Sequence, residues 1–340
     1  MMRKPTIDDV AREAGVSKGL VSLALNGRPG VSAAARERID AAAAELGWRP
    51  STNARSLAMK RAYSLGLVVR RDPSTFEADP FFAAYVAGVE SVLAAHGQVL
   101  VLSVVPDHET ETQTYRRLIA DQRVDGFLLT DLLESDPRIE LIAGLGGRAV
   151  TLGRPQGESP FPAVTRDYAS GIESLLTHLA ELGHRRVAHV AGDENMQHAR
   201  TRLERHREVA DRLGLETVVE HTDFSPEQGM DATRRLLARP DRPTAIVYAN
   251  DPMAFAGIAV AHELGLDLPG ELSIAGMDGS DMGRFVYPTL TTLDNDPAGW
   301  GRASTQALLD LVERGQAADV PLPPAALIVR ASTTAPTATA

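Results

Sequence analysis

The chain has 340 residues, of which 44% are hydrophobic and 24% charged, the balance of a globular protein too long for one ordinary core. Cysteine is absent, which excludes disulfides and thiolate metal sites, and no apolar run approaches the roughly 18 residues that a membrane span needs. The formal net charge of −10 argues against a chain that binds nucleic acid along its whole length.

The start of the chain predicts two short helices joined by a tight turn. Thr6 can cap the first helix, Asp9 adds negative charge at its positive end, and Gly15 can take the left-handed conformation that ends it. Ser17 can cap the second helix. The apolar faces are formed by Ile7, Val10, Ala11 and Ala14 on the first helix and by Leu20, Val21 and Leu25 on the second. This pattern indicates a helix-turn-helix, whose second helix enters the DNA major groove, and the alternative is a surface hairpin without a ligand.

Charge is distributed unevenly along the chain. Residues 1–61 hold 11 Lys and Arg against 6 Asp and Glu, a net charge of +5, whereas the remainder holds 24 against 39, a net charge of −15. A basic segment joined to an acidic body favours a DNA-binding module fused to a domain that does not bind DNA. Met1 to Lys4 are not followed by the apolar segment of a secretory signal, so we expect a cytoplasmic protein.

A third helix and a linker follow the motif. Ser32 opens a predicted helix that Gly47 ends, and the Arg49-Pro50 pair breaks the chain. Residues 51–59 form a helical stretch that is too short to be stable alone, so we interpret it as a linker that folds when DNA or a partner holds it. We therefore expect a DNA-binding headpiece at 1–50 and a hinge helix and linker at 51–62.

From residue 63 to 331 the pattern alternates between strands and helices, which predicts an α/β fold with parallel sheets. The length favours two lobes, and the small, polar residues 332–340 are expected to be a disordered tail. We expect strands at residues 64–69, 99–104, 126–129, 148–152, 187–190, 217–220, 245–248 and 272–275, and helices at residues 81–96, 109–121, 168–182, 202–213, 226–237, 252–264 and 297–315.

Signatures spread over nearly the whole chain resemble those of the lactose-repressor family of bacterial transcription regulators. In the headpiece and linker they are residues 7–11 (IDDVA), 15–17 (GVS), 21–22 (VS), 25–27 (LNG), 49–50 (RP) and 53–57 (NARSL). In the body they are residues 79–82 (DPFF), 123–126 (RVDG), 182–186 (LGHRR), 239–245 (RPDRPTA), 250–251 (ND) and 288–292 (PTLTT). The resemblance implies a homodimeric repressor with a periplasmic-binding-protein-like (type I) body that encloses a small effector.

The resemblance also implies a set of DNA contacts. Base-reading positions fall on Lys18, Gly19 and Leu23, and the usual arginine at the last of these is replaced by a side chain that cannot hydrogen-bond a guanine. Phosphate contacts, or helix caps only, are expected from Thr6, Ser17, Ser22, Asn26 and Ser32. The paired hinge helices are expected to enter the minor groove through Asn53, Ala54 and Leu57, with Leu57 wedged between base steps.

An effector site is expected in the cleft between the lobes. Its expected residues are Arg70, Phe81, Phe82, Arg202, Phe224, Asn250 and Asp278, because an aromatic face with arginine, amide and carboxylate groups suits a polyol. Many relatives carry Asp-Arg where this chain has Gly153-Arg154, so one carboxylate is missing. Arg70 and Arg71 would favour an acidic or phosphorylated ligand unless they are solvated or paired with Asp72. We expect a sugar, sugar acid or sugar phosphate.

Other functions stay open at this point. A phosphoprotein corepressor could replace the small effector, and a solute-binding protein would share the body fold but would lack the basic headpiece. We find no nucleophile elbow, phosphate-binding loop or metal-spaced histidine cluster, so we expect neither an enzyme nor a cofactor. The C-terminal residues carry no heptad repeat for a tetramerisation helix, which favours a dimer.

Overall fold

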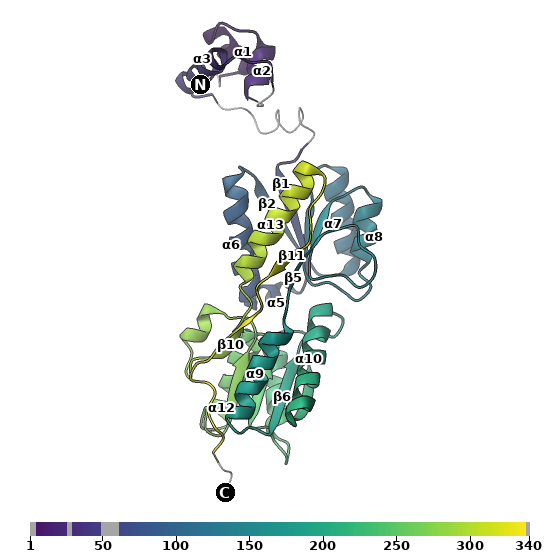
Figure 1. Ribbon diagram of the computed structural model, residues 1–340, viewed down its shortest axis with the longest axis vertical. Coiled ribbons are helices and arrows are strands. Elements are labelled where there is room, and N and C mark those ends of the chain that lie inside the picture. Colours follow the sequence, from purple (N-terminus) through teal and green to yellow (C-terminus); the bar gives the residue numbers. More distant parts are fainter. Residues whose placement is uncertain (1–4, 26–28, 49–60, 338–340) are drawn as a thin grey trace. The chain divides into compact units, whose positions relative to one another are not determined.

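The computed structural model describes residues 5–25, 29–48 and 61–337, in two units that divide between Tyr63 and Ser64. The first unit holds three helices, α1 (Ile7–Glu13), α2 (Lys18–Leu25) and α3 (Ala33–Glu45) (Figure 1). A capping box begins α1, in which the Asp9 carboxylate accepts from the Thr6 backbone N–H at 2.8 Å; the Thr6 hydroxyl also donates to this carboxylate, at 2.7 Å. Ser17 and Ser32 accept backbone N–H bonds at the starts of α2 and α3.

The three helices enclose a small apolar core. Its buried residues are Val10, Ala11, Ala14, Val21, Ala24, Ile39, Ala42 and Ala43. Gly15 has a φ of +64° between α1 and α2, a conformation that costs a glycine little. Arg36 of α3 donates to the Ala24 carbonyl at 2.7 Å, so it satisfies one of the free acceptors at the end of α2. The helix-turn-helix and third helix are thus present as the sequence predicts.

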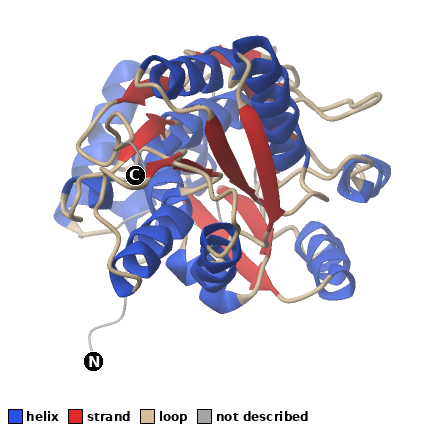
Figure 2. Ribbon diagram, turned by 90° about the horizontal axis from the view of Figure 1, so that it is seen from below, coloured by secondary structure: helices blue, strands red, loops and turns tan. Residues whose placement is uncertain are grey.

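The second unit consists of two α/β lobes, each with a six-stranded sheet between helices (Figures 1 and 2). In the first lobe the sheet has the order β11-β5-β4-β3-β1-β2, and every pair is parallel. Its strands are β1 (Ser64–Arg70), β2 (Val99–Val105), β3 (Phe127–Leu129), β4 (Ala149–Leu152), β5 (Ala163–Arg166) and β11 (Val320–Leu322). Its helices are α5 (Pro73–Ala78), α6 (Pro80–Ala95), α7 (His108–Ala120), α8 (Pro137–Gly144) and α13 (Pro297–Arg314).

The sheet of the second lobe has the order β12-β10-β9-β8-β6-β7 and is parallel except for β12. Its strands are β6 (Arg186–Ala191), β7 (Glu216–His221), β8 (Ala245–Tyr248), β9 (Ser273–Gly276), β10 (Thr291–Asp294) and β12 (Ala326–Ile328). Its helices are α9 (Ala169–Glu181), α10 (Gln197–Leu213), α11 (Pro226–Leu237), α12 (Asp251–Glu263) and the 3-10 turn η1 (Asp281–Arg284). The chain crosses between the lobes three times, after β5, β10 and β11.

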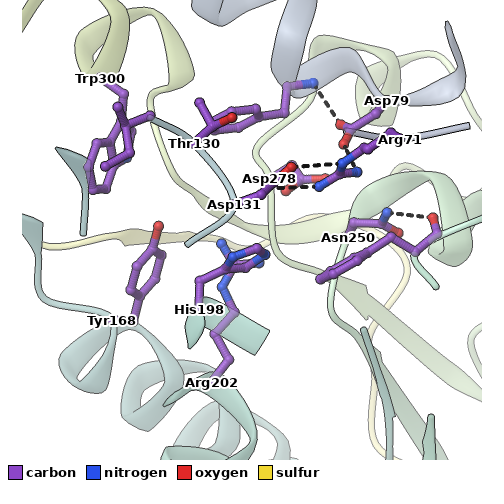
Figure 3. Close-up of a pocket in the computed structure, with 13 residues that line it drawn as sticks. Arg71, Asp79, Thr130, Asp131, Tyr168, His198, Arg202, Asn250, Asp278 and Trp300 are labelled. Atoms are coloured by element: carbon purple, nitrogen blue, oxygen red, sulfur yellow. Dashed lines mark hydrogen bonds and ion pairs between the residues drawn. The ribbon is translucent and has the colours of Figure 1, made fainter. Parts of the chain in front are cut away.

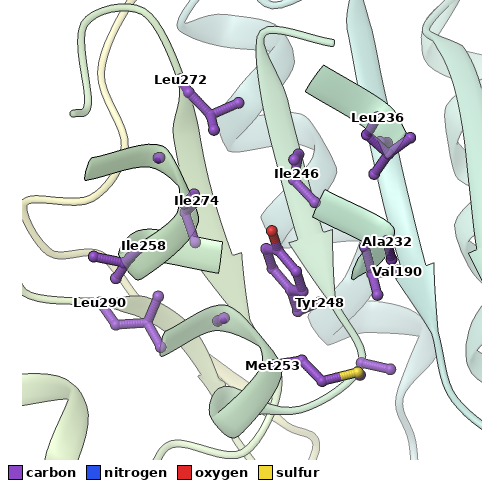
Figure 4. Packing of buried hydrophobic residues seen from close by; sticks show 14 of the residues in the cluster. Val190, Ala232, Leu236, Ile246, Tyr248, Met253, Ile258, Leu272, Ile274 and Leu290 are labelled. Atoms are coloured by element: carbon purple, nitrogen blue, oxygen red, sulfur yellow. The ribbon is translucent and has the colours of Figure 1, made fainter. Parts of the chain in front are cut away.

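Both faces of each sheet are buried, as a parallel sheet requires. In β1, Leu65 and Leu67 pack on the side of α6 and α13, whereas Val68 packs on the side of α7 and α8. In the second lobe a core forms around Tyr248, whose hydroxyl contacts Thr233 at 2.7 Å (Figure 4).

Two glycines let α13 pack closely on α6. A Cβ atom at Gly88 would lie 2.1 Å from the Ala298 carbonyl oxygen, and one at Gly301 would lie 2.2 Å from the Tyr85 carbonyl oxygen. Across the same contact, the Tyr85 hydroxyl lies 3.0 Å from that of Ser304. In the sequence, helix α13 comes directly after β10 of the second lobe. This packing nevertheless places α13 in the first lobe.

The prediction of a disordered tail from residue 332 is wrong for residues 332–337. The Ser332 side chain is buried and donates to the Ile274 carbonyl at 2.6 Å, while its own backbone oxygen accepts from Ile274. His184 contacts the Thr334 carbonyl, and Thr337 donates to that of Gly270. The small, polar residues of this segment are used for hydrogen bonds along β9.

Candidate functional site

A cavity lies between the two lobes of the second unit (Figure 3). Polar and aromatic side chains from both lobes form its wall. The lining residues are Arg71, Asp79, Phe81, Thr130, Asp131, Leu152, Tyr168, His198, Arg202, Phe224, Asn250, Asp278 and Trp300.

Strand ends position most of these side chains. In the first lobe Arg71 follows β1, Thr130 and Asp131 follow β3, and Leu152 ends β4. In the second lobe Asn250 and Asp278 follow β8 and β9. The carboxyl ends of parallel strands therefore meet at the cavity from both sides, which is where open α/β sheets bind ligands.

Arg71 is the centre of the first-lobe wall. Its Nε and Nη2 atoms donate to the two Asp131 oxygens at 2.9 and 3.0 Å, and Nη1 donates to Asp79 at 3.0 Å. The guanidinium also lies over the Phe82 and Phe224 rings, 5.1 and 5.6 Å from their centroids. The charge of Arg71 is therefore compensated and its side chain is fixed, with three of its five N–H groups donating to carboxylates.

Three carboxylates of the cavity titrate differently. Burial opposes ionisation of Asp131, but the charge and hydrogen bonds of Arg71 overcome it and lower the pKa of that carboxyl. Burial, followed by repulsion from Asp251, raises the pKa of Asp278 to about 7. Burial also raises the pKa of Asp79 to about 7, where repulsion from Asp278 adds to burial and Arg71 opposes it.

The second-lobe wall is held by a buried polar network. Asp278 accepts from the Asp251 N–H at 2.9 Å, and the Asp251 carboxylate accepts from the Thr292 hydroxyl at 2.7 Å and the Ser280 N–H at 2.7 Å. Asn250 caps α12 by accepting from Met253. The polar ends of Asn250 and Asp278 are thus held by hydrogen bonds before a ligand binds.

Aromatic groups complete the wall. Phe224, with a φ of +71°, covers Gly192 so closely that a Cβ there would lie 2.0 Å from the ring. The same ring stacks on His198 at 5.4 Å. Burial lowers the pKa of His198 to about 3, so this imidazole is neutral. Arg202 donates to the Ala249 carbonyl at 3.0 Å and lies over the Tyr168 ring.

The structure brings together most, but not all, of the residues expected at the effector site. Phe81, Arg202, Phe224, Asn250 and Asp278 line the cavity. The expectation was wrong for the other two. Arg70 donates instead to Glu111 at 3.2 Å on the other side of β1, and Phe82 is buried in the core against Arg71.

Sequence reasoning missed several cavity residues. Thr130 and Asp131 follow a short apolar strand, the same signal that identified Asn250 and Asp278, so Asp131 could have been found. The sequence left Arg71 to favour an acidic ligand, to be solvated or to pair with Asp72, but Asp72 caps α5 by accepting from Ser74. Tyr168, His198 and Trp300 lie at lobe crossings and a helix start, where no sequence signal marked them.

The predicted DNA-reading residues lie on the first unit. Lys18, Gly19 and Leu23 are exposed on α2, and Lys18 pairs with Asp8 at 3.1 Å. Thr6, Ser17 and Ser32 are engaged as helix caps, and Ser22 is half-buried. Asn26, Asn53, Ala54 and Leu57 lie outside the described residues, so their expected contacts stay predictions.

Comparison with known proteins decides the family. Residues 6–51 match the bacterial regulatory proteins of the lacI family, and residues 176–333 match the periplasmic binding protein-like domain. The chain is 33% identical over 315 residues to the transcriptional regulator CelR of Thermobifida fusca, covering 91% of this chain and 92% of that one. The chain belongs to the LacI family of bacterial regulatory proteins.

Two solved structures of LacI-family proteins resemble this one. The CelR–cellobiose complex has a TM-score of 0.74 and 31% sequence identity over 97% of this chain and all of that one. The lac repressor dimer bound to operator and an anti-inducer has a TM-score of 0.83 and 30% identity over 98% of this chain and all of that one. As a LacI-family member, the chain is a DNA-binding transcriptional regulator and not an enzyme. Among the described residues, no helix is both long and apolar enough to cross a membrane.

Proposed function

We propose that this LacI-family member is a cytoplasmic repressor whose operator affinity is controlled by a sugar or sugar derivative in the cavity between the lobes. The observation that carries the proposal is the cavity wall. Asn250 and Asp278, which are held by hydrogen bonds, line the same cavity as the Phe81 and Phe224 rings, and this set of groups can hydrogen-bond sugar hydroxyls while a sugar ring stacks on an aromatic. The cellobiose complex of CelR supports the choice of a sugar.

The charges of the cavity favour hydroxyl groups over an anion beside β1. Arg71 already donates to Asp131 and Asp79, so its positive charge is compensated and three of its five N–H groups are occupied. The Asp278 carboxylate can accept hydrogen bonds from sugar hydroxyls. The charges of Arg70 and Arg71 are thus compensated by Glu111, Asp131 and Asp79, which supports a ligand rich in hydroxyl groups beside β1.

We also propose a homodimer, as in the lac repressor complex. The turn η1 and the loop after it expose three large apolar side chains. The accessible fractions are 56% for Met282, 75% for Phe285 and 83% for Tyr287. Strand β2 is an unpaired sheet edge that exposes Val99 and Leu102. Large exposed apolar groups of this kind are typical of surfaces that a partner covers. Sedimentation of wild type and Tyr287→Asp tests this, and a monomeric wild type would contradict it.

A ligand screen tests the proposed effector class. Full-length protein is heated with cellobiose, glucose, maltose or ribose, and a bound sugar raises the melting temperature. Calorimetry then compares wild type with Asp278→Asn and with Asp231→Asn, a control at an exposed aspartate on α11. We expect Asp278→Asn to weaken binding by at least about tenfold and the control to change it little. Equal affinity of all three proteins would remove Asp278 from the site.

A further inference from the structure

A second cavity of about 270 Å³ adjoins the first, which measures about 70 Å³. The two share Leu152, Tyr168, His198 and Trp300 as lining residues, so they are neighbouring chambers of one cleft. Typical small-molecule sites occupy about 300–1,000 Å³. The first chamber alone is below that range, so a ligand of sugar size needs further space, and the second chamber offers it.

The two chambers differ in charge. The first is lined by the carboxylates Asp79, Asp131 and Asp278, which surround Arg71. The second is lined by Arg154 and Arg166 and by no carboxylate of the described residues. Arg154 is neutralised at the surface by Asp319, which lies 2.6 Å from it. The remaining charge of the second chamber is therefore that of Arg166.

The guanidinium of Arg166, the last residue of β5, is only partly used. Its Nη1 atom donates to the Pro323 carbonyl at 2.6 Å. Its Nε and Nη2 atoms are buried and have no hydrogen-bond partner in the part of the chain that the structure describes. Nε and Nη2 form the edge of an arginine that takes a carboxylate or phosphate through two parallel hydrogen bonds. A buried donor without a partner is costly, so an anion placed there would remove that cost.

A second donor lies on the same wall. Trp300, from the first turn of α13, lines both chambers and is only 4% exposed. Its indole Nε1 is buried and likewise lacks a partner among the described residues. The Arg166 guanidinium lies 5.8 Å from the centre of the Trp300 ring. Two kinds of unpaired N–H group thus belong to side chains that line this end of the cleft, and N–H groups are the donors from which an anion accepts.

We propose that the second chamber binds a carboxylate or phosphate group of the effector through Arg166, while the hydroxyls of the same molecule occupy the first chamber. This inference rests on the proposed sugar-binding function and narrows it to an acidic or phosphorylated sugar. Arg166 sets the preference for charge, and Asp278 and Asn250 hold the polyol end.

Calorimetry on the full-length protein with matched probes tests this. The pairs are cellobiose with cellobionate, and glucose with glucuronate and with glucose 6-phosphate, so that carboxylate and phosphate are compared separately. We expect wild type to bind at least one acidic member about tenfold or more tightly than its neutral parent. Arg166→Gln should remove this preference while the neutral parent binds within about twofold of wild type.

Two further variants control for charge and fold. Arg239→Gln removes an exposed arginine that pairs with Asp241 and lines neither chamber, and it should preserve the preference. Arg166→Lys keeps the charge without the two-pronged edge and should retain only part of it. Neutral sugars binding as tightly as their acids, or an unchanged preference in Arg166→Gln, would overturn the inference and leave sugar binding intact. Failure of every sugar to bind would contradict the proposed function itself and the inference with it.

Discussion

Arg71 and Asp131 form a two-pronged ion pair, with Nε–Oδ2 and Nη2–Oδ1 distances of 2.9 and 3.0 Å, inside the cleft between the lobes (Figure 3). The Arg71 side chain is 7% exposed and that of Asp131 is 17% exposed. Water has little access to either side chain and so cannot replace either partner. The pair therefore both stabilises the first lobe and sets the charge on this wall of the cleft.

Replacing Asp131 with alanine should destabilise the protein. The change leaves the buried Arg71 charge with Asp79 alone, and loss of one partner of a buried pair costs about 3 kcal/mol or more. Denaturant unfolding of the full chain measures the loss. As a control, Glu263→Ala breaks the exposed pair with Arg234, which should cost below about 1 kcal/mol. Equal losses in the two variants would show that Asp131 does not hold Arg71 as described.

The stacked pair His189 and His206 should make stability depend on pH. Their ring centroids lie 4.6 Å apart and both side chains are buried. Burial lowers the pKa of His189 to about 4 and that of His206 well below its usual value, with nearby positive groups adding to the effect. The unfolded chain gains protons below about pH 6.5 while the folded chain does not. The stability is therefore present above that pH and is lost as the pH falls toward 4.

The variant His206→Phe isolates this effect, because it retains a stacked ring and removes one titrating group. Between pH 6.5 and 5 it should lose less stability than wild type, by about 1.4 kcal/mol per pH unit. Comparing the two proteins cancels the opposite contribution of Asp79 and Asp278, whose raised pKa values make the folded state less favourable as the pH rises toward 7. His96→Gln changes an exposed histidine and should track wild type. Parallel curves for wild type and His206→Phe would rule out the buried pair as the cause.

The contact between Gly192 and Phe224 should control ligand binding. A Cβ at Gly192 would enter the space of the Phe224 ring, so Gly192→Ala must displace an aromatic wall of the cavity. We expect sugar affinity to fall by about tenfold or more, as judged by calorimetry. Gly144→Ala adds the same methyl group where no atom lies within 4 Å and should have no effect. Wild-type affinity in Gly192→Ala would mean that the ring does not contact the ligand.

Lys18 is expected to contact DNA from the start of α2. Its pair with Asp8 is exposed, so Lys18→Ala should leave headpiece stability within about 1 kcal/mol of wild type. Operator affinity should fall, and the slope of affinity against salt should decrease by about one if Lys18 binds a phosphate. Asp8→Ala removes the partner and keeps the lysine, so DNA binding should stay or strengthen. Titrations of a DNA fragment selected from a random library measure both the operator affinity and its dependence on salt.

The sequence predicts the main elements well because their patterns are long and periodic. Helix α11 begins and ends at the predicted residues, Pro226 and Leu237, and β8 does so at Ala245 and Tyr248. Strands β5, β10, β11 and β12 were missed, because polar residues or a proline interrupt the first three and β12 has only three residues, whereas β8 is a continuous apolar run. Helices α5 and α8 were missed for a similar reason, although each begins with proline after a capping aspartate.

At the candidate site the sequence prediction was wrong by one position at the end of β1, and it did not separate two neighbouring phenylalanines. Consecutive strand residues point to opposite faces, so Arg70 reaches Glu111 while Arg71 reaches the cleft. Consecutive helix residues also diverge, so Phe81 lines the cleft while Phe82 is in the core. Trp300 joins the cleft only because Gly88 and Gly301 let α13 pack on α6, a long-range contact that no local pattern contains.

Operator binding as a function of ligand tests the central claim most directly. Fluorescence anisotropy with the selected DNA fragment measures the affinity of wild type and Asp278→Asn, with and without the sugar that raises the melting temperature most. The account predicts that the sugar changes the operator affinity of wild type by at least about fivefold, while Asp278→Asn binds the same DNA and barely responds. An identical response of both proteins, or none in a wild type saturated with sugar, would contradict control of DNA binding from this cleft.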